Sequence, residues 1–227
     1  MNSGTTLILD SNQLNVTWPA YVELLREQEQ LWWRHNKNIA VFGENSYLAE
    51  SSQSTAAFDE FGALQSMDDN LRAFVGGWLR GYRYFGNMAS AGRYMGIVKR
   101  TPEFVDTFLN QIPRKGPVRE DQIQTYFAGV TAMHGISLPG TATRLLVSKR
   151  PDVFLGLTSA NRDGVIRVFG RSPRKPDEYL VLLRRIWSFP WYKAPRPTDA
   201  EGQEVWDARV ALLDAFLFDA SGNGAAW

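Results

Sequence analysis

The segment 158–164, TSANRDG, carries three side chains that could act on a substrate: Ser159, Asn161 and Asp163. A carboxylate can stabilise a cationic transition state, an amide can hold an attacking water, and a hydroxyl can orient water without supplying charge. Each has an ordinary structural alternative. Asp163 could complete a helix cap with Thr158 or Ser159, and Asn161 could be a polar residue at a helix start. The sequence leaves these alternatives open.

The residues before this segment have the pattern of a glycine turn that opens a helix. Gly135 can adopt a positive φ, Ser137 can cap the following helix, and Pro139 suits its first turn. The backbone N–H groups of such a turn, with the helix dipole behind them, can bind a nucleic-acid phosphate. We therefore expect Gly135, Ser137, Gly140 and Thr141 to contact DNA.

The charge distribution supports a partner of this kind, although the net charge is only +1. Residues 1–70 carry three basic and ten acidic side chains, whereas 80–119 and 144–175 each carry eight basic and two acidic ones. Local basic surfaces of this kind neutralise phosphates. Within the second block, we expect Arg144 to contact a phosphate, and Lys149 to meet either phosphate or solvent.

The elements that must position these residues are almost all helical. Apolar residues at helical spacing, with caps and bounding prolines, predict helices over 19–36, 68–84, 101–113, 120–133, 142–149 and 176–189. A Thr198–Glu201 capping box predicts a further amphipathic helix over 198–219. Residues 39–66 show no clear period, which favours a loop over a lid or a specificity insert. No βαβ alternation or internal repeat is present, which argues against a Rossmann or P-loop protein.

Composition excludes several classes of function. The 227 residues include no cysteine, so disulfides and a cysteine-bound iron–sulfur cluster are ruled out. With His35 and His134 as the only histidines, a histidine zinc site or a serine–histidine triad is not expected. No apolar run is long enough to span a membrane, and the start of the chain lacks signal-peptide features. We expect a cytoplasmic protein.

Residues 130–170 resemble the helix-hairpin-helix of the DNA glycosylase superfamily, in which a glycine hairpin precedes a proline and an apolar link. In that superfamily a Val-Asp-Thr-His segment then opens the next helix and supplies the catalytic aspartate. Aligned without gaps, Ser159 takes the place of the aspartate and Asn161 that of the histidine, and Asp163 lies one helical turn further on. The chain is most similar to a bacterial branch resembling 8-oxoguanine DNA glycosylase, some of whose relatives excise hypermodified bases from phage DNA.

The resemblance implies a mostly α, glycosylase-like fold as a single unit over 1–227. It places an acidic N-terminal region at 1–67 and the helix-hairpin-helix and catalytic segment at 120–170. The implied partner is double-stranded DNA containing a modified base, bound by a monomer, with base flipping assisted by a wedge residue, for which Asn87 is the candidate. The hairpin carbonyls of this superfamily often hold a structural monovalent cation; no organic cofactor is implied.

The expected activity is monofunctional hydrolysis of a modified base, such as glucosylated hydroxymethylcytosine in phage DNA or an oxidised purine. Bifunctional relatives attack with a lysine near the start of the hairpin helix, whereas Lys149 lies about 16 Å further along. Asp163 is the first candidate carboxylate and Asn161 the second candidate, as a water-holding amide; Asp121 or Asp177 could substitute. Two rivals remain: a non-catalytic DNA-binding module of a defence system, favoured by Ser159, and a helical scaffold that only packs.

Overall fold

The computed structural model describes residues 9–34, 40–44, 46–77, 96, 98–135, 138 and 140–218. Within these residues the protein is mostly helical and contains no strand beyond an isolated bridge between Ala40 and Ser46. The helices are α1 (Trp18–Arg34), α2 (Tyr47–Phe61), η1 (Leu64–Ser66), α3 (Asp69–Val75), α5 (Pro102–Leu109), α6 (Glu120–His134), α7 (Gly140–Lys149), α8 (Arg162–Phe169), α9 (Pro176–Ser188), α10 (Pro190–Lys193), α11 (Ala200–Ala208), η2 (Ala211–Leu213) and α12 (Asp214–Leu217). The expectation of a mostly α protein is confirmed.

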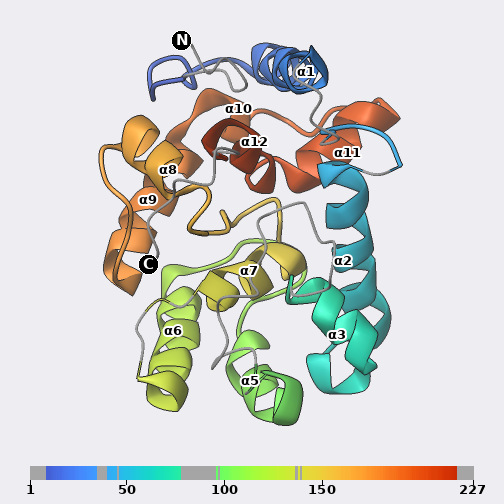
Figure 1. The fold of residues 1–227 in the computed structure, drawn as a ribbon, viewed down its shortest axis with the longest axis vertical. Coiled ribbons are helices and arrows are strands. Elements are labelled where there is room, and N and C mark those ends of the chain that lie inside the picture. The colour runs from blue at the N-terminus through green and yellow to red at the C-terminus, as the bar shows by residue number, and fades with distance from the viewer. Residues whose placement is uncertain are drawn as a thin grey trace.

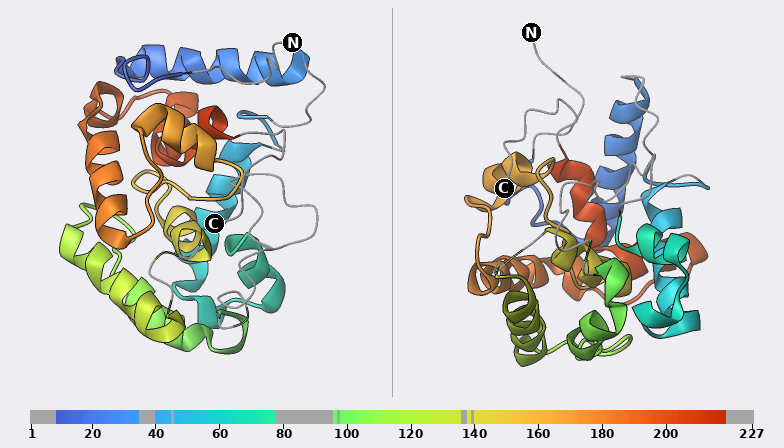
Figure 2. Two further views of the ribbon diagram at one scale, coloured as in Figure 1. Left: turned by 60° about the vertical axis from the view of Figure 1, so that its left-hand side comes forward. Right: turned by 60° about the horizontal axis from the view of Figure 1, so that its bottom comes forward.

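Helix α7 lies in the middle of the molecule, with α1 at one end and α5 and α6 at the other (Figures 1 and 2). Residues 141–149 are all buried. Helices α2 and α3 pack against α7, α5 packs against α6, α6 against α9, and α8 against α12. Because α7 is surrounded, its polar residues must find partners inside the protein.

Most helices begin where local chemistry predicts. The carboxylate of Asp68 accepts a hydrogen bond from the N–H of Leu71 at 2.8 Å and opens α3. Pro102 and Pro176 occupy the first turns of α5 and α9. In each case the signal lies within a few residues of the helix start, so tertiary contacts were not needed to find it.

Residues 39–66 are not the expected loop. Most of the segment forms α2, whose N-cap Ser46 accepts a hydrogen bond from the N–H of Ala49 at 3.1 Å. The helix was missed because its buried side includes Glu50, Ser51 and Ser54 together with apolar residues, so its sequence has no clear apolar stripe. Tertiary packing, rather than amphipathic periodicity, stabilises this helix.

The C-terminal helix also differs from the expectation. Asp199, not Thr198, is the N-cap of α11, and its carboxylate accepts the N–H of Gly202 at 2.7 Å. The helix ends at Ala208 instead of continuing to residue 219. The N–H groups of Val210 and Ala211 turn to the Pro151 carbonyl, at 3.2 and 2.9 Å, so a long-range contact interrupts the helical pattern.

Candidate functional site

The turn between α6 and α7 has the predicted backbone geometry at its start. Gly135 ends α6 with φ 69°, in the left-handed region, and its N–H donates to the carbonyl of Thr131 at 2.8 Å. Nothing lies within 4 Å of a Cβ built on Gly135, so the backbone conformation, not lack of space, requires glycine. Ser137 and Pro139, and with them the predicted cap, lie outside the described residues. Gly140 is the first residue of α7.

Arg144 does not lie on the surface where a phosphate contact was expected. Its side chain has no exposed area, and its Nη2 donates to Glu50 Oε1 at 2.7 Å. Its Nε points to the carbonyl of Val75 at 3.4 Å. Burial lowers the pKa of Arg144, and the negative charge of Glu50 opposes that effect. In this conformation the guanidinium is enclosed by protein, so a DNA phosphate would not reach it.

Lys149 is likewise directed inward. Its Nζ donates to the Leu109 carbonyl at 3.1 Å and lies 5.8 Å from the centre of the Phe58 ring. Burial lowers the pKa of this amine to about 8. Neither solvent nor phosphate is its partner here, because the chain around α5 encloses it. Asn87, the proposed wedge, lies outside the described residues.

The side-chain amide of Asn161 is buried, and both its oxygen and its nitrogen form hydrogen bonds within the protein. Asn161 is the N-cap residue of α8 and has no exposed area. Its Oδ1 accepts the N–H of Thr158 at 2.9 Å, and its own N–H donates to Thr158 Oγ1 at 3.1 Å. Its Nδ2 donates to the Gly156 carbonyl at 2.7 Å and to Asp214 Oδ1 at 2.5 Å. Both amide hydrogens therefore have acceptors, so Asn161 positions the start of α8.

Asp214, on α12, is a second buried acid near Arg144, in addition to Glu50. The Tyr47 hydroxyl donates to Asp214 Oδ2 at 3.1 Å, so the carboxylate is held by two residues, Tyr47 and Asn161, that lie far apart in the sequence. Burial raises the pKa of Asp214 to about 6, although hydrogen bonds from Asn161 and Tyr47 and the charge of Arg144 oppose the increase.

Glu50 completes what we call the buried polar cluster: Tyr47, Glu50, Arg144, Asn161 and Asp214. Burial raises the pKa of Glu50 to about 8; the charge of Arg144 lowers it and that of Asp214 raises it. Two carboxyl groups share one guanidinium, so the cluster is electrically neutral when one carboxyl holds a proton. The cluster joins α2, α7, α12 and the start of α8.

The sequence interpretation missed three members of this cluster, Tyr47, Glu50 and Asp214. Glu50 sits in the segment that showed no periodicity. Asp214 offered a usable signal, because it is an acid inside the otherwise apolar run VALLDAFLF. Such an acid is rarely buried without partners.

The exposed face of α8 presents a different set of groups. Asp163 is exposed in the first turn, and its carboxylate has no hydrogen-bond or ion-pair partner among the described residues. The predicted alternative of a cap does not apply, because the N-cap position of α8 is taken by Asn161 and the Asp163 carboxylate makes no hydrogen bond to Thr158 or Ser159. Arg167 follows Asp163 by four residues, so both lie on one face of the helix, beside Ile166, which is 39% exposed.

The remaining predicted positions are scattered. Ser159 is half-buried. Thr141 is buried, and its hydroxyl has no hydrogen-bond partner within the described part of the chain. Asp121 is exposed and bound by Arg119, with two contacts of 2.9 Å, and Asp177 is exposed on α9. Neither acid belongs to the buried polar cluster.

Comparison with models of protein families, with curated proteins and with solved structures gives no match to this chain. The described residues contain no group of three or more histidine, cysteine, aspartate or glutamate side chains placed to hold a metal ion. Among the described helices, none has both the length and the apolar character needed to cross a bilayer.

Proposed function

We propose that this protein is a monofunctional DNA glycosylase that binds duplex DNA through the α6–α7 turn and hydrolyses the bond between deoxyribose and a modified base. The observation that carries the proposal is the accessible carboxylate of Asp163 on α8, the helix that follows the hairpin and the apolar link. Asn161 anchors the start of that helix through its bond to Asp214. A rigid helix start is what a catalytic group needs for precise positioning.

In the proposed reaction, Asp163 stabilises the positive charge that develops on the sugar as the C1′–N bond breaks. A water oxygen bonds to C1′ and its proton is transferred to the departing base, which leaves an abasic sugar. Ile166 and Arg167, on the same face of α8, supply an apolar contact and a cation for the flanking nucleotide. The exposed side chains of Arg171, Arg174 and Lys175 extend this basic surface beyond the helix.

The absence of lyase chemistry is part of the same proposal. A Schiff base needs a lysine whose amine reaches the sugar, and Lys149 is directed to the Leu109 carbonyl instead. Borohydride should therefore trap no covalent complex between protein and DNA during turnover. A trapped complex that disappears in Lys149→Met would contradict this part of the proposal.

The test is abasic-site formation on three DNAs: unmodified duplex, duplex with 8-oxoguanine, and phage DNA with glucosylated hydroxymethylcytosine. Asp163→Asn should reduce the rate at least about 100-fold while DNA binding persists. The matched control is Glu103→Gln, which alters another exposed acid in the first turn of a helix, α5, and should leave the rate unchanged. Equal loss in both variants, or none in either, would remove Asp163 from the mechanism.

A non-catalytic DNA-binding module is the second candidate. One observation favours it: the amide of Asn161 is occupied inside the protein, so it cannot also hold an attacking water. A module of this kind would bind DNA with strong salt dependence and leave no abasic sites on any of the three substrates. A purely structural scaffold would not bind DNA at all.

A further inference from the structure

A cavity of about 360 Å³ lies beyond the far end of α7, away from the hairpin turn. Its lining includes Arg150, which directly follows α7, whereas the turn precedes α7. The ten residues of α7 span about 15 Å, so this cavity is separate from the hairpin turn, and none of its described lining residues belongs to α8. Its volume is in the range of about 300–1,000 Å³ that is usual for small-molecule sites.

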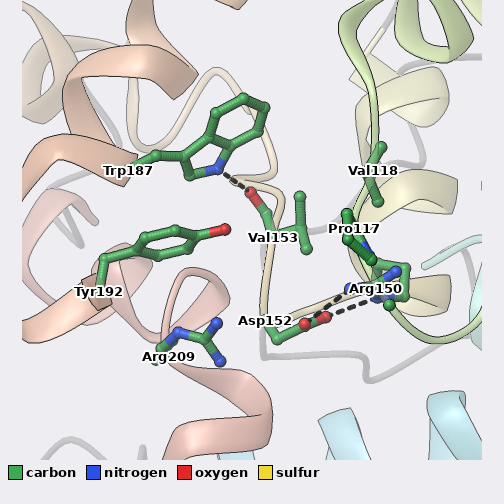
Figure 3. Close-up of a pocket in the computed structure, with 9 residues that line it drawn as sticks. Pro117, Val118, Arg150, Asp152, Val153, Trp187, Tyr192 and Arg209 are labelled. Atoms are coloured by element: carbon green, nitrogen blue, oxygen red, sulfur yellow. Dashed lines mark hydrogen bonds and ion pairs between the residues drawn. The ribbon is translucent and has the colours of Figure 1, made fainter. Parts of the chain in front are cut away.

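One wall of the cavity is a stack of aromatic rings and a guanidinium. The rings of Trp187 and Tyr192 are stacked, with centres 6.4 Å apart, and the Arg209 guanidinium lies 4.7 Å from the centre of the Tyr192 ring. Arg209 also lies 3.9 Å from the centre of the Trp206 ring. Figure 3 shows the Tyr192 hydroxyl and the Arg209 guanidinium directed from this wall toward the cavity. The stack fixes the guanidinium in place.

The opposite wall contains Asp152, whose carboxylate is paired with Arg150. Arg150 binds Asp152 through two hydrogen bonds of 2.8 and 2.9 Å, and its Nη1 donates to the Pro113 carbonyl at 2.8 Å. An ionised carboxylate has about four acceptor positions, so Asp152 can still accept from a ligand. Pro117, Val118 and Val153 give the remaining lining an apolar character.

Arg209 is a buried cation with no carboxylate in contact among the described residues. It is only 8% exposed. The two acids that act on it electrostatically are bound elsewhere, Asp152 to Arg150 and Asp207 to Arg196. Nη1 of Arg209 donates to the Trp206 carbonyl at 2.6 Å, and the Arg209 side chain also hydrogen-bonds the Tyr192 hydroxyl. A guanidinium held in this way at a cavity is suited to bind an anion.

We propose that this cavity binds a terminal nucleoside monophosphate, with the phosphate at Arg209 and Tyr192 and the sugar or base against Asp152 and the apolar wall. A cavity of this size exceeds what a bare phosphate needs, and the Asp152 carboxylate can accept hydrogen bonds from the N–H or O–H groups of a nucleoside. The same group occurs in a free mononucleotide and at the 5′-phosphorylated end of a DNA strand. The proposal does not depend on glycosylase activity.

The test is calorimetric titration of the full chain with dAMP, dCMP, inorganic phosphate and deoxycytidine. A mononucleotide should bind more tightly than either phosphate or the nucleoside. Competition by short duplexes with a 5′-phosphate or a 5′-hydroxyl then identifies the source: competition by the 5′-phosphorylated duplex alone indicates a DNA end, and its absence indicates a free nucleotide.

Arg209→Gln should weaken binding at least about tenfold, because it removes charge-assisted hydrogen bonds to the phosphate. Pro117→Glu places a negative charge at the exposed rim and should weaken binding without altering the stack, so the proposal can be tested even if Arg209→Gln fails to fold. Arg26→Gln is the matched control, since it removes an exposed arginine outside the cavity. Phosphate binding as tight as nucleotide binding, or binding unaffected by Pro117→Glu, would overturn the proposal.

Discussion

Arg144 and Arg209 are both buried, but they stand in opposite electrostatic surroundings. Arg144 faces the carboxyl groups of Glu50 and Asp214 inside the buried polar cluster, whereas Arg209 lies on aromatic rings beside a cavity. A buried charge that the protein itself neutralises contributes to holding the fold together. A buried charge that remains uncompensated at a cavity is available to a ligand. The buried polar cluster is therefore a structural region, whereas the cavity beside Arg209 is the proposed binding region.

Removing the first of these cations should have the largest effect on stability. Arg144→Met leaves two buried carboxyl groups without their shared cation, so the free energy of unfolding should fall by about 3–5 kcal/mol. Urea unfolding followed by circular dichroism measures this loss. The control is Arg184→Met, which breaks an Arg–Glu pair with Glu120 that is exposed to water and should matter little. Equal losses in the two variants would show that burial does not distinguish them.

The pH dependence of stability should reveal the same cluster. The folded-state pKa of Glu50, about 8, and that of Asp214, about 6, both lie above the ordinary values of 4.5 and 3.8. Between the ordinary pKa and the folded-state pKa of each group, the folded protein binds more protons than the unfolded chain. The free energy of unfolding therefore falls as the pH rises from the ordinary values toward the folded-state values. We expect a loss on the order of 3 kcal/mol from pH 5 to pH 8.5.

Glu50→Gln should flatten that curve, since a neutral side chain does not titrate. Unfolding midpoints measured across the pH range check this. A variant curve that runs parallel to that of the wild type would mean that other groups cause the dependence.

Helices α8 and α12 are packed so closely at Gly164 that one added methyl group tests the contact. A Cβ on Gly164 would collide with the backbone of Leu217 in α12, which cannot rotate away. Gly164→Ala should therefore cost about 1–3 kcal/mol in unfolding free energy. Gly156→Ala is the control, because its added methyl would meet Val147 at an ordinary 3.5 Å. If both alanine variants unfold at the wild-type midpoint, the α8–α12 contact is looser than described.

Of these substitutions, Arg209→Met should change the free energy of unfolding least. Arg209→Met breaks no ion pair among the described residues and keeps an apolar side chain against the rings, so we expect a change of about 1 kcal/mol. Saturating mononucleotide should raise the melting temperature of the wild type and leave that of Arg209→Met unchanged. A loss as large as that of Arg144→Met would remove the distinction between the two arginines.

Local sequence signals determined much of the helical framework. The positive φ of Gly135, the Asp68 cap and the prolines that open α5 and α9 each depend on neighbours within a few residues, which the sequence displays directly. The apolar spacing along α1, α6 and α9 also indicates helices without further information.

The tertiary structure alone decided the interior of the candidate site. Glu50, Asp214 and Asn161 come from distant parts of the chain, and only packing around α7 brings them together. Arg144 and Lys149 are buried because other helices pack over α7, although the sequence around them is that of a basic surface. A charge pattern shows the sign of a side chain's charge but not how deeply that side chain is buried, because burial depends on every helix packed around it.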